Sequence, residues 1–182
     1  MRRAFLREFN ILVSTPRERE QAAMSEVRYF IGDLIGDDDL SISFTNVSGL
    51  LTCRTSLNPF EVIHELSEFA EENPHQFRFA IKFTPIEKCV KSEIETIVEA
   101  AQELCSKVRE DETFRVTVRR RHTDLDHMEI VGATADVISR EVDLEKPDKH
   151  LWIEVIGDVT GVSVLVEEED ILSIMTMRDD MY

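Results

Sequence analysis

Apolar and polar residues alternate along two segments of the chain. Every second residue from Phe77 to Phe83 is apolar, and the same alternation runs from Thr113 to Arg120. A period of two is typical of a strand with one buried face. The pattern therefore predicts strands at both places.

The first 84 residues predict the element order βαββαβ. Thr15, Pro16 and Glu18 have the residue types of a helix start, and Asn58-Pro59 repeats that chemistry. Apolar residues at helical spacing follow both starts. The predicted strands cover 10–14, 40–44, 50–54 and 77–83, and the predicted helices begin at Thr15 and Asn58. This order is that of a ferredoxin-like α+β module.

A second module is predicted from residue 85, because Thr84-Pro85 interrupts the pattern. A helical stretch ends near Arg109, the strand at 113–120 follows, and Asp126 with Glu129 favours a second helix start. Apolar residues at 151–156 and 162–166 then predict a hairpin. The sequence therefore predicts two α+β modules, residues 1–84 and 85–182.

Four basic or titratable residues, Arg119, Arg120, Arg121 and His122, crowd the end of the strand at 113–120. Because neighbouring strand residues point to opposite faces, at least two of the arginines must reach solvent. There they could contact RNA phosphates, and their replacement by alanine is expected to weaken RNA binding without unfolding the chain. The alternative is a strand edge kept charged against aggregation.

Other basic residues flank the predicted elements of the second module. A lysine in a connection can follow a backbone phosphate, although each could equally be an ordinary surface lysine. Arg78 and Lys82 share the polar side of the strand at 77–83 and could form a basic strip. The lysines predicted to bind RNA are Lys88, Lys91, Lys146 and Lys149.

The formal net charge of −16 is unusual for a protein that binds nucleic acid. Residues 1–85 hold 9 basic and 13 acidic side chains, and residues 86–182 hold 12 and 24. Charges more than about 8 Å apart are largely screened at physiological salt, so a local basic patch can still bind phosphate. The predominance of arginine, 15 against 6 lysines, suits bidentate phosphate contacts.

Catalytic signatures are missing from the sequence. It has no Gly-x-Ser-x-Gly motif and no glycine-rich phosphate loop. We therefore predict that the chain is not catalytic and binds no cofactor. The run from His122 to His127 holds two His and two Asp, but their spacing is not that of a zinc site, so no metal is predicted. Cys53, Cys89 and Cys105 lack paired spacing and predict reduced thiols in the cytoplasm. No stretch approaches the roughly 20 apolar residues of a membrane span, so no membrane partner is expected.

An ordered set of short segments lies along the second module: Phe114 to Arg121, Gly132, Val142-Asp143-Leu144, Pro147-Asp148 and Trp152 to Val155. With these segments the module resembles a THUMP domain, an RNA-binding module of tRNA-modifying proteins. The segment Phe83 to Lys88 is similar to the entry of THUMP in the small adaptor proteins of tRNA cytidine N4-acetylation. That resemblance covers roughly Phe77 to Met175.

The resemblance to these adaptors implies a role in tRNA acetylation without catalysis. The adaptor would bind the acceptor stem and 3′ end of tRNA, and deliver a cytidine to a separate RNA cytidine acetyltransferase. No room for a catalytic domain is expected beyond the two modules. The alternatives are an RNA-binding subunit of another tRNA-modification complex, a regulatory ferredoxin-like protein that binds a small molecule, and a small phosphatase using Arg17 or Arg54.

Overall fold

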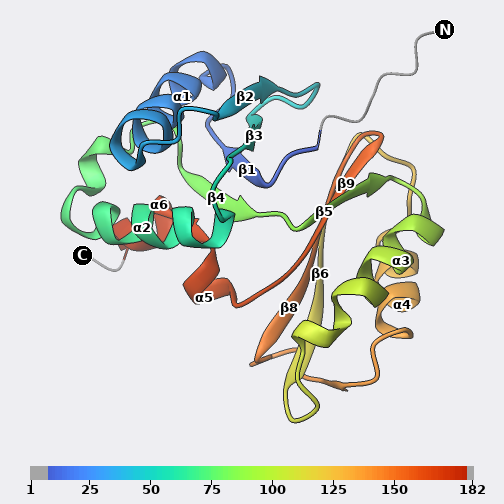
Figure 1. Cartoon of the computed structure of the whole chain (residues 1–182). Helices are drawn as coiled ribbons and strands as arrows, with labels where there is room; N and C mark the ends of the chain where they lie inside the picture. Colours follow the sequence, from blue (N-terminus) through green and yellow to red (C-terminus); the bar gives the residue numbers. More distant parts are fainter. Residues whose placement is uncertain (1–7, 180–182) are drawn as a thin grey trace, which may run out of the picture. The chain divides into compact units, whose positions relative to one another are not determined.

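The computed structural model describes residues 8–179, which form two compact units, each built on a five-stranded sheet (Figure 1). One unit comprises residues 9–85 together with residues 168–179, and the other comprises Ile86–Glu167. Both combine helices with strands. The α+β class expected from the sequence is therefore confirmed.

The first unit follows the order strand, helix, strand, strand, helix, strand. Its sheet has the order β10-β4-β1-β3-β2, where β10 is Leu172–Ser173, and every pair of neighbouring strands is antiparallel. The helices pack on one face, where Phe30 and Phe77 stack with ring centroids 4.2 Å apart at the centre of the core. The elements are β1 (Ile11–Ser14), α1 (Glu20–Val27), the π-helix η1 (Arg28–Ile35), β2 (Ser41–Phe44), β3 (Leu50–Arg54), α2 (Pro59–Glu72), the 3-10 helix η2 (Pro74–Gln76) and β4 (Lys82–Pro85).

The strand predicted at 77–83 is wrong for residues 77–81, because β4 begins only at Lys82. The carboxylate of Glu26 accepts hydrogen bonds from the backbone N–H groups of Arg78, Phe79 and Ala80 at 2.8 to 3.0 Å. These amides are thereby satisfied by a side chain of α1 instead of a neighbouring strand. The alternation of phenylalanines reflects packing against the core and not a strand.

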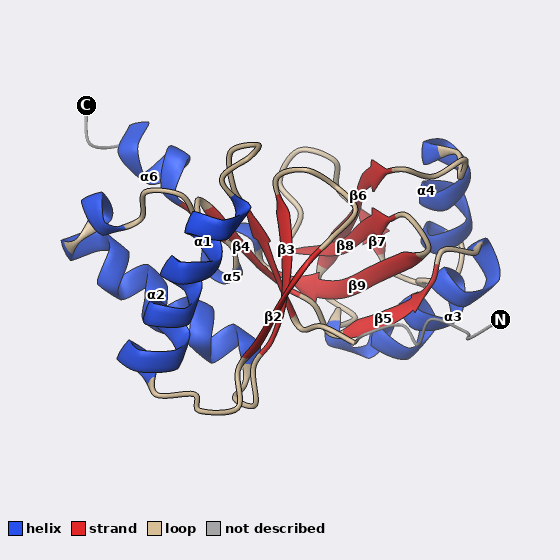
Figure 2. Cartoon of the chain, turned by 90° about the horizontal axis from the view of Figure 1, so that it is seen from above, coloured by secondary structure: helices blue, strands red, loops and turns tan. Residues whose placement is uncertain are grey.

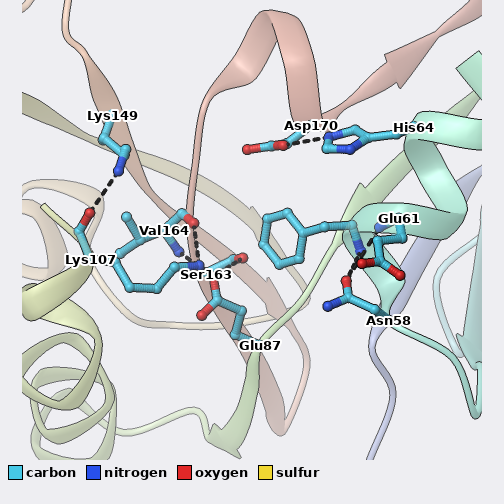
Figure 3. Close-up of polar contacts among 10 residues, drawn as sticks. Asn58, Glu61, His64, Glu87, Lys107, Lys149, Ser163, Val164 and Asp170 are labelled. Atoms are coloured by element: carbon cyan, nitrogen blue, oxygen red, sulfur yellow. Dashed lines mark hydrogen bonds and ion pairs between the residues drawn. The ribbon is translucent and has the colours of Figure 1, made fainter.

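The helix predicted to begin at Thr15 starts later than its capping residues suggested. Its first residue is Glu20, and the preceding Glu18 has a φ of 65°. Glu20 instead accepts a hydrogen bond from the Gly49 N–H at 2.7 Å, which holds the β2–β3 turn. The second predicted start is confirmed, since Asn58 accepts hydrogen bonds from the Phe60 and Glu61 N–H groups (Figure 3).

Asp37 joins the end of η1 to the loop that follows β3. Its carboxylate is buried and accepts hydrogen bonds from the Thr55 hydroxyl at 2.5 Å and from the Ser56 hydroxyl and N–H at 2.5 and 2.9 Å. Burial opposes ionisation, but the bonds from Ser56 and Thr55 outweigh it and hold the pKa of Asp37 below its usual value of 3.8.

Asp37→Asn is expected to destabilise the first unit by about 2 kcal/mol at pH 7, because bonds to a charged acceptor are lost. A carboxyl whose pKa is lower in the folded than in the unfolded chain stabilises the fold fully at a pH above the unfolded pKa. This stabilisation is lost as the pH falls through the folded pKa. The difference between the two proteins should therefore shrink below about pH 4. Urea unfolding from pH 7 to pH 3 measures this, and a difference independent of pH would contradict it.

The end of the described chain returns to the first unit, although the sequence placed residues 85–182 in one module. The elements are α5 (Glu167–Asp170), β10 (Leu172–Ser173) and α6 (Ile174–Asp179). β10 pairs with β4, and the Ile174 N–H donates to the Ile81 carbonyl at 2.9 Å. His64 of α2 lies 2.8 Å from the Asp170 carboxylate, which fixes α5 to that helix (Figure 3).

The second unit has the sheet order β5-β9-β8-β6-β7, with β6 parallel to both of its neighbours. α3 and α4 lie side by side on one face of this sheet (Figures 1 and 2). The predicted start of the second helix is confirmed, since Asp126 accepts from the Glu129 N–H at 3.0 Å. The elements are β5 (Lys88–Lys91), α3 (Ile94–Leu104), the 3-10 helix η3 (Cys105–Lys107), β6 (Thr113–Arg121), α4 (His127–Ala135), β7 (Glu141–Val142), β8 (Lys149–Ile156) and β9 (Val159–Leu165).

The two faces of the second sheet differ in chemistry. Phe114 and Val118 of β6, with Leu151 and Ile153 of β8, belong to the core shared with α3 and α4. The residues between them point to the opposite face, since strand residues alternate. That face carries Arg115, Thr117, Arg119 and Arg121 from β6 and His150, Trp152, Glu154 and Ile156 from β8. We call it the helix-free face, because neither α3 nor α4 packs on it.

Candidate nucleic-acid interface

The end of β6 presents two exposed arginines on opposite faces of the sheet. Arg119 lies on the helix-free face and Arg120 on the face of α3 and α4. The Arg120 guanidinium donates to the Leu125 carbonyl at 2.6 Å, in the connection to α4. This single bond leaves most of the guanidinium donors of Arg120 available to another acceptor.

Arg121 is held by the protein itself. Its guanidinium is ion-paired with the carboxylate of Glu154, whose side chain is only 3% exposed. The other carboxylate oxygen of Glu154 accepts a hydrogen bond from the Trp152 indole N–H at 2.8 Å. Arg121 therefore compensates a buried charge, so the expectation that all three arginines can be removed without harm to the fold does not hold for it.

Arg119 is positioned by the same tryptophan. Its guanidinium carbon lies 5.9 Å from the centre of the Trp152 ring, which is within the range of a cation–π interaction. A cation–π contact occupies no N–H donor of the guanidinium. An arginine held in this way can donate to a phosphate without first being ordered.

His122 continues the basic cluster beyond β6. It is exposed and has a φ of 54°, so the chain turns sharply at this residue toward α4. Asp126, in the run from His122 to His127, caps α4. Within residues 8–179 no three His, Cys, Asp or Glu side chains gather in a group that could hold a metal ion.

Lys91 lies in the same row of the sheet as Arg121. Register pairs Lys91 with Val159, Val159 with Ile156, and Ile156 with Arg121. Register partners point to the same face, so Lys91 and Arg121 share the helix-free face, three strand spacings or roughly 14 Å apart. Lys91 is exposed. Arg119, Arg120, His122 and Lys91 thus lie at one end of the sheet, and we call them the basic rim.

The remaining lysines of the second unit lie elsewhere. Lys88 lies on the edge strand β5, on the helix-covered side, where it pairs with Glu103 of α3. Lys149 starts β8, opposite Phe114, so five or more residues of β6, roughly 17 Å or more, separate it from the arginines of the basic rim. Lys146 is exposed in the connection just before it. The structure therefore does not bring all predicted lysines onto one surface.

Lys149 also has partners within the unit. It donates to the Lys107 carbonyl at 2.7 Å (Figure 3). It also lies 3.3 Å from the Glu112 carboxylate. The backbone N–H of Arg109, and next the hydrogen bond from Lys149, hold the pKa of Glu112 below its usual value. Arg78 and Lys82 belong to the first unit, where the Arg78 guanidinium carbon lies 5.4 Å from the Phe79 ring centre.

Four basic residues of the second unit were not among those predicted to bind RNA: Lys107, Arg109, Arg115 and Arg140. Arg115 is exposed on the helix-free face and donates to the Leu144 carbonyl at 2.9 Å. Its place on the same face as Arg119 and Arg121 follows from strand alternation, which the sequence did show. Lys107 is paired with Glu87 and donates to the Val164 carbonyl at 3.1 Å (Figure 3). Nothing local in the sequence indicates those partners.

Acidic side chains border the basic rim. Asp124 and Asp126 lie in the connection to α4, and Asp158 lies in the turn between β8 and β9, all of them exposed. They confine the positive potential to a small area, and repel phosphates placed beyond it. The basic rim can therefore contact only a short stretch of a phosphate backbone. A broad basic surface would accept such a backbone at many positions.

Comparison with protein families finds a match to the THUMP domain over residues 91–165. This range lies wholly inside the second unit and contains the basic rim. A search of curated protein sequences finds no match for the chain.

Solved structures with a similar fold extend over most of the chain. PH1313 from Pyrococcus horikoshii has a TM-score of 0.65 at 18% identity, covering 91% of this chain and 55% of that one. TrmN from Thermus thermophilus has a TM-score of 0.55 at 14% identity, covering 85% and 44%. A 4-thiouridine synthetase, solved with RNA and bound ATP, has a TM-score of 0.54 at 14% identity, covering 91% and 42%. The chain spans about half the length of these proteins, or somewhat less. Residues 91–165 form a THUMP domain.

Proposed function

We propose that the chain is a tRNA-binding adaptor that presents tRNA to a separate RNA cytidine acetyltransferase. The observation that carries the RNA-binding part is the THUMP domain at 91–165, with two exposed arginines at the end of its strand β6. A similar fold in a 4-thiouridine synthetase that was solved with RNA supports the same role. The acetyltransferase partner rests on the sequence resemblance of Phe83 to Lys88 and the THUMP segments.

The basic rim would contact the phosphates of the tRNA acceptor end. Arg119 and Arg120 point to opposite faces of β6, so together they can grip a backbone that crosses the strand end. Lys91 would add a point charge on the helix-free face. Contacts of this kind set the position of an RNA without reading its sequence.

The first unit would serve as a ferredoxin-like module in the same chain as the THUMP domain. Its antiparallel strand order β4-β1-β3-β2, with helices on one face, supports that assignment. Arg78 is exposed on this unit and would offer a further phosphate contact.

The mechanism we propose is positioning in the cytoplasm, without catalysis or a cofactor in this chain. The adaptor would supply affinity and geometry, and the acetyltransferase would supply the acetyl donor and the chemistry. Once the adaptor holds both the tRNA and the acetyltransferase, these two meet within one complex and no longer by free diffusion, which lowers the entropic cost of the transfer. Among residues 8–179 no helix is long and apolar enough to cross a membrane.

The adaptor role is tested by acetyl transfer to tRNA. A purified RNA cytidine acetyltransferase is incubated with tRNA and acetyl-CoA, with and without this chain, and N4-acetylcytidine is measured. We expect the chain to raise the yield at limiting tRNA, and the Arg119→Ala/Arg120→Ala variant to lose that gain. Binding to tRNA without any gain in acetylation would reject the acetylation role and favour another tRNA-modification complex.

A further inference from the structure

β2 forms an open edge of the first unit's sheet and carries no charge. Residues 40–53, which include β2 and most of β3, are the longest run of the chain without Asp, Glu, Lys or Arg. Within the described part of the chain β2 pairs only with β3, and Phe44 at its end is 54% exposed. Edge strands of monomeric proteins are commonly protected by charge or proline, and β2 has neither.

The hydrogen-bond pattern shows which peptide groups of β2 point outward. The Thr15 N–H donates to the Gly49 carbonyl, so Gly49, Leu51 and Cys53 are bonded toward β1. Thr52 between them is therefore bonded toward β2, opposite Ser43. It follows that Ile42 and Phe44 direct their N–H and C=O groups away from the sheet.

We infer that two copies of this chain associate by antiparallel pairing of their β2 strands. With a two-fold axis at Ser43, Ile42 of one copy faces Phe44 of the second copy, and Phe44 faces Ile42. Both residues of each pair have outward peptide groups, so the pairing forms four main-chain hydrogen bonds. A strand that complements itself in this register fits a closed two-fold dimer.

The side chains favour the same register. Ile42 pairs with Cys53 of β3, and Phe44 pairs with Leu51 of β3. Both of these β3 residues are buried in the core of the unit. The pairing would therefore place an apolar row of one copy end to end with that of the other. A pair of aromatic and β-branched residues across neighbouring strands contributes roughly 0.2 to 1 kcal/mol.

Charge explains why a second copy would use this edge. Each chain has a net charge of −16, so two copies repel each other over most approaches. The hairpin at 40–53 has no charged side chain of its own, so it offers apolar contact without a like charge on the pairing strand. One short strand from each copy makes a small interface, so we expect a dissociation constant in the micromolar range, on the order of 10 to 100 μM.

The first test is sedimentation equilibrium of the full chain from about 1 to 500 μM, a range that brackets the expected constant. We expect a reversible monomer–dimer equilibrium that Phe44→Glu abolishes. Met128→Glu is the matched control, because Met128 is 67% exposed and lies in the other unit. A monomer throughout the range, or equal loss of dimer in both variants, would overturn the proposal.

The second test fixes the register with a disulfide. In the proposed pairing the two Ser43 residues form a non-hydrogen-bonded pair with Cα atoms about 4.5 Å apart, which suits a disulfide. Ser41 is two residues off the axis, so its two copies would lie about 13 Å apart. The background carries Cys89→Ser and Cys105→Ser, and burial raises the pKa of the Cys53 thiol to about 12, which keeps it unreactive.

We expect Ser43→Cys to give a disulfide-linked dimer under mild oxidation at about 100 μM protein, near the expected constant. Ser41→Cys should remain monomeric under the same conditions. Cross-linking of Ser41→Cys in preference to Ser43→Cys, or of neither, would overturn the proposed pairing.

Discussion

Glu154→Leu is expected to lower the stability of the unit formed by Ile86–Glu167 by about 3 kcal/mol. The substitution removes the acceptor of the buried Trp152 indole N–H and the partner of Arg121, whose side chain is 27% exposed. In a unit of this size the loss should lower the unfolding midpoint by roughly 10 °C or more. Trp152 is the only tryptophan of the chain, so its fluorescence reports the unfolding of this unit directly.

Two further variants show whether the buried carboxylate is the cause. Glu154→Gln keeps one oxygen that can accept from the Trp152 indole N–H but loses the charge that pairs with Arg121, so we expect it to recover part of the stability. Combining Glu154→Leu with Arg121→Met removes both charges, and should be less harmful than the sum of the two single changes. An unfolding midpoint of Glu154→Leu equal to that of the unaltered chain would contradict the structural role assigned to this group.

The double replacement Arg119→Ala/Arg120→Ala is expected to weaken tRNA binding on the order of tenfold or more at low salt, while the fold is retained. Both side chains are exposed, and the contacts they lose within the protein are one cation–π contact and one hydrogen bond. Each phosphate contact removed should also flatten the slope of log affinity against log salt by up to about one unit. Fluorescence anisotropy with labelled tRNA across a salt series measures both effects.

A variant with the same change in charge separates local contact from net charge. Arg109→Ala/Lys146→Ala removes two exposed basic residues outside the basic rim. Lys146 lies in the connection that precedes β8, and Arg109 follows η3. We expect this pair to change affinity and salt slope much less than the pair in the rim. An equal or larger loss would place the RNA contact at the other end of the sheet.

Local signals in the sequence predicted local structure well. Asn58 and Asp126 cap their helices as expected, because a capping side chain and the N–H groups that it accepts are neighbours in sequence. Alternation also predicted β6 and showed that the arginines at its end could not all be buried. The THUMP resemblance was likewise carried by short segments in a fixed order.

Contacts between distant residues were not visible in the sequence. The alternation at 77–83 is that of a strand, but Glu26, about 50 residues away, binds the amides that a strand would pair. Arg121 looked equivalent to Arg119, because its partner Glu154 follows 33 residues later and is found only through the parallel pairing of β6 and β8. For the same reason the sequence could not separate Lys91, which lies at the basic rim, from Lys149 at the opposite end.

The measurement that tests the central claim most directly is binding of the purified chain to intact tRNA and to the same tRNA lacking its 3′ end, over a salt titration. The account predicts binding that weakens steeply with salt and drops when the 3′ end is removed. It also predicts that the Arg119→Ala/Arg120→Ala variant no longer distinguishes the two RNAs. Absence of binding to intact tRNA at low salt, or equal binding to both RNAs by the unaltered chain, would contradict the claim.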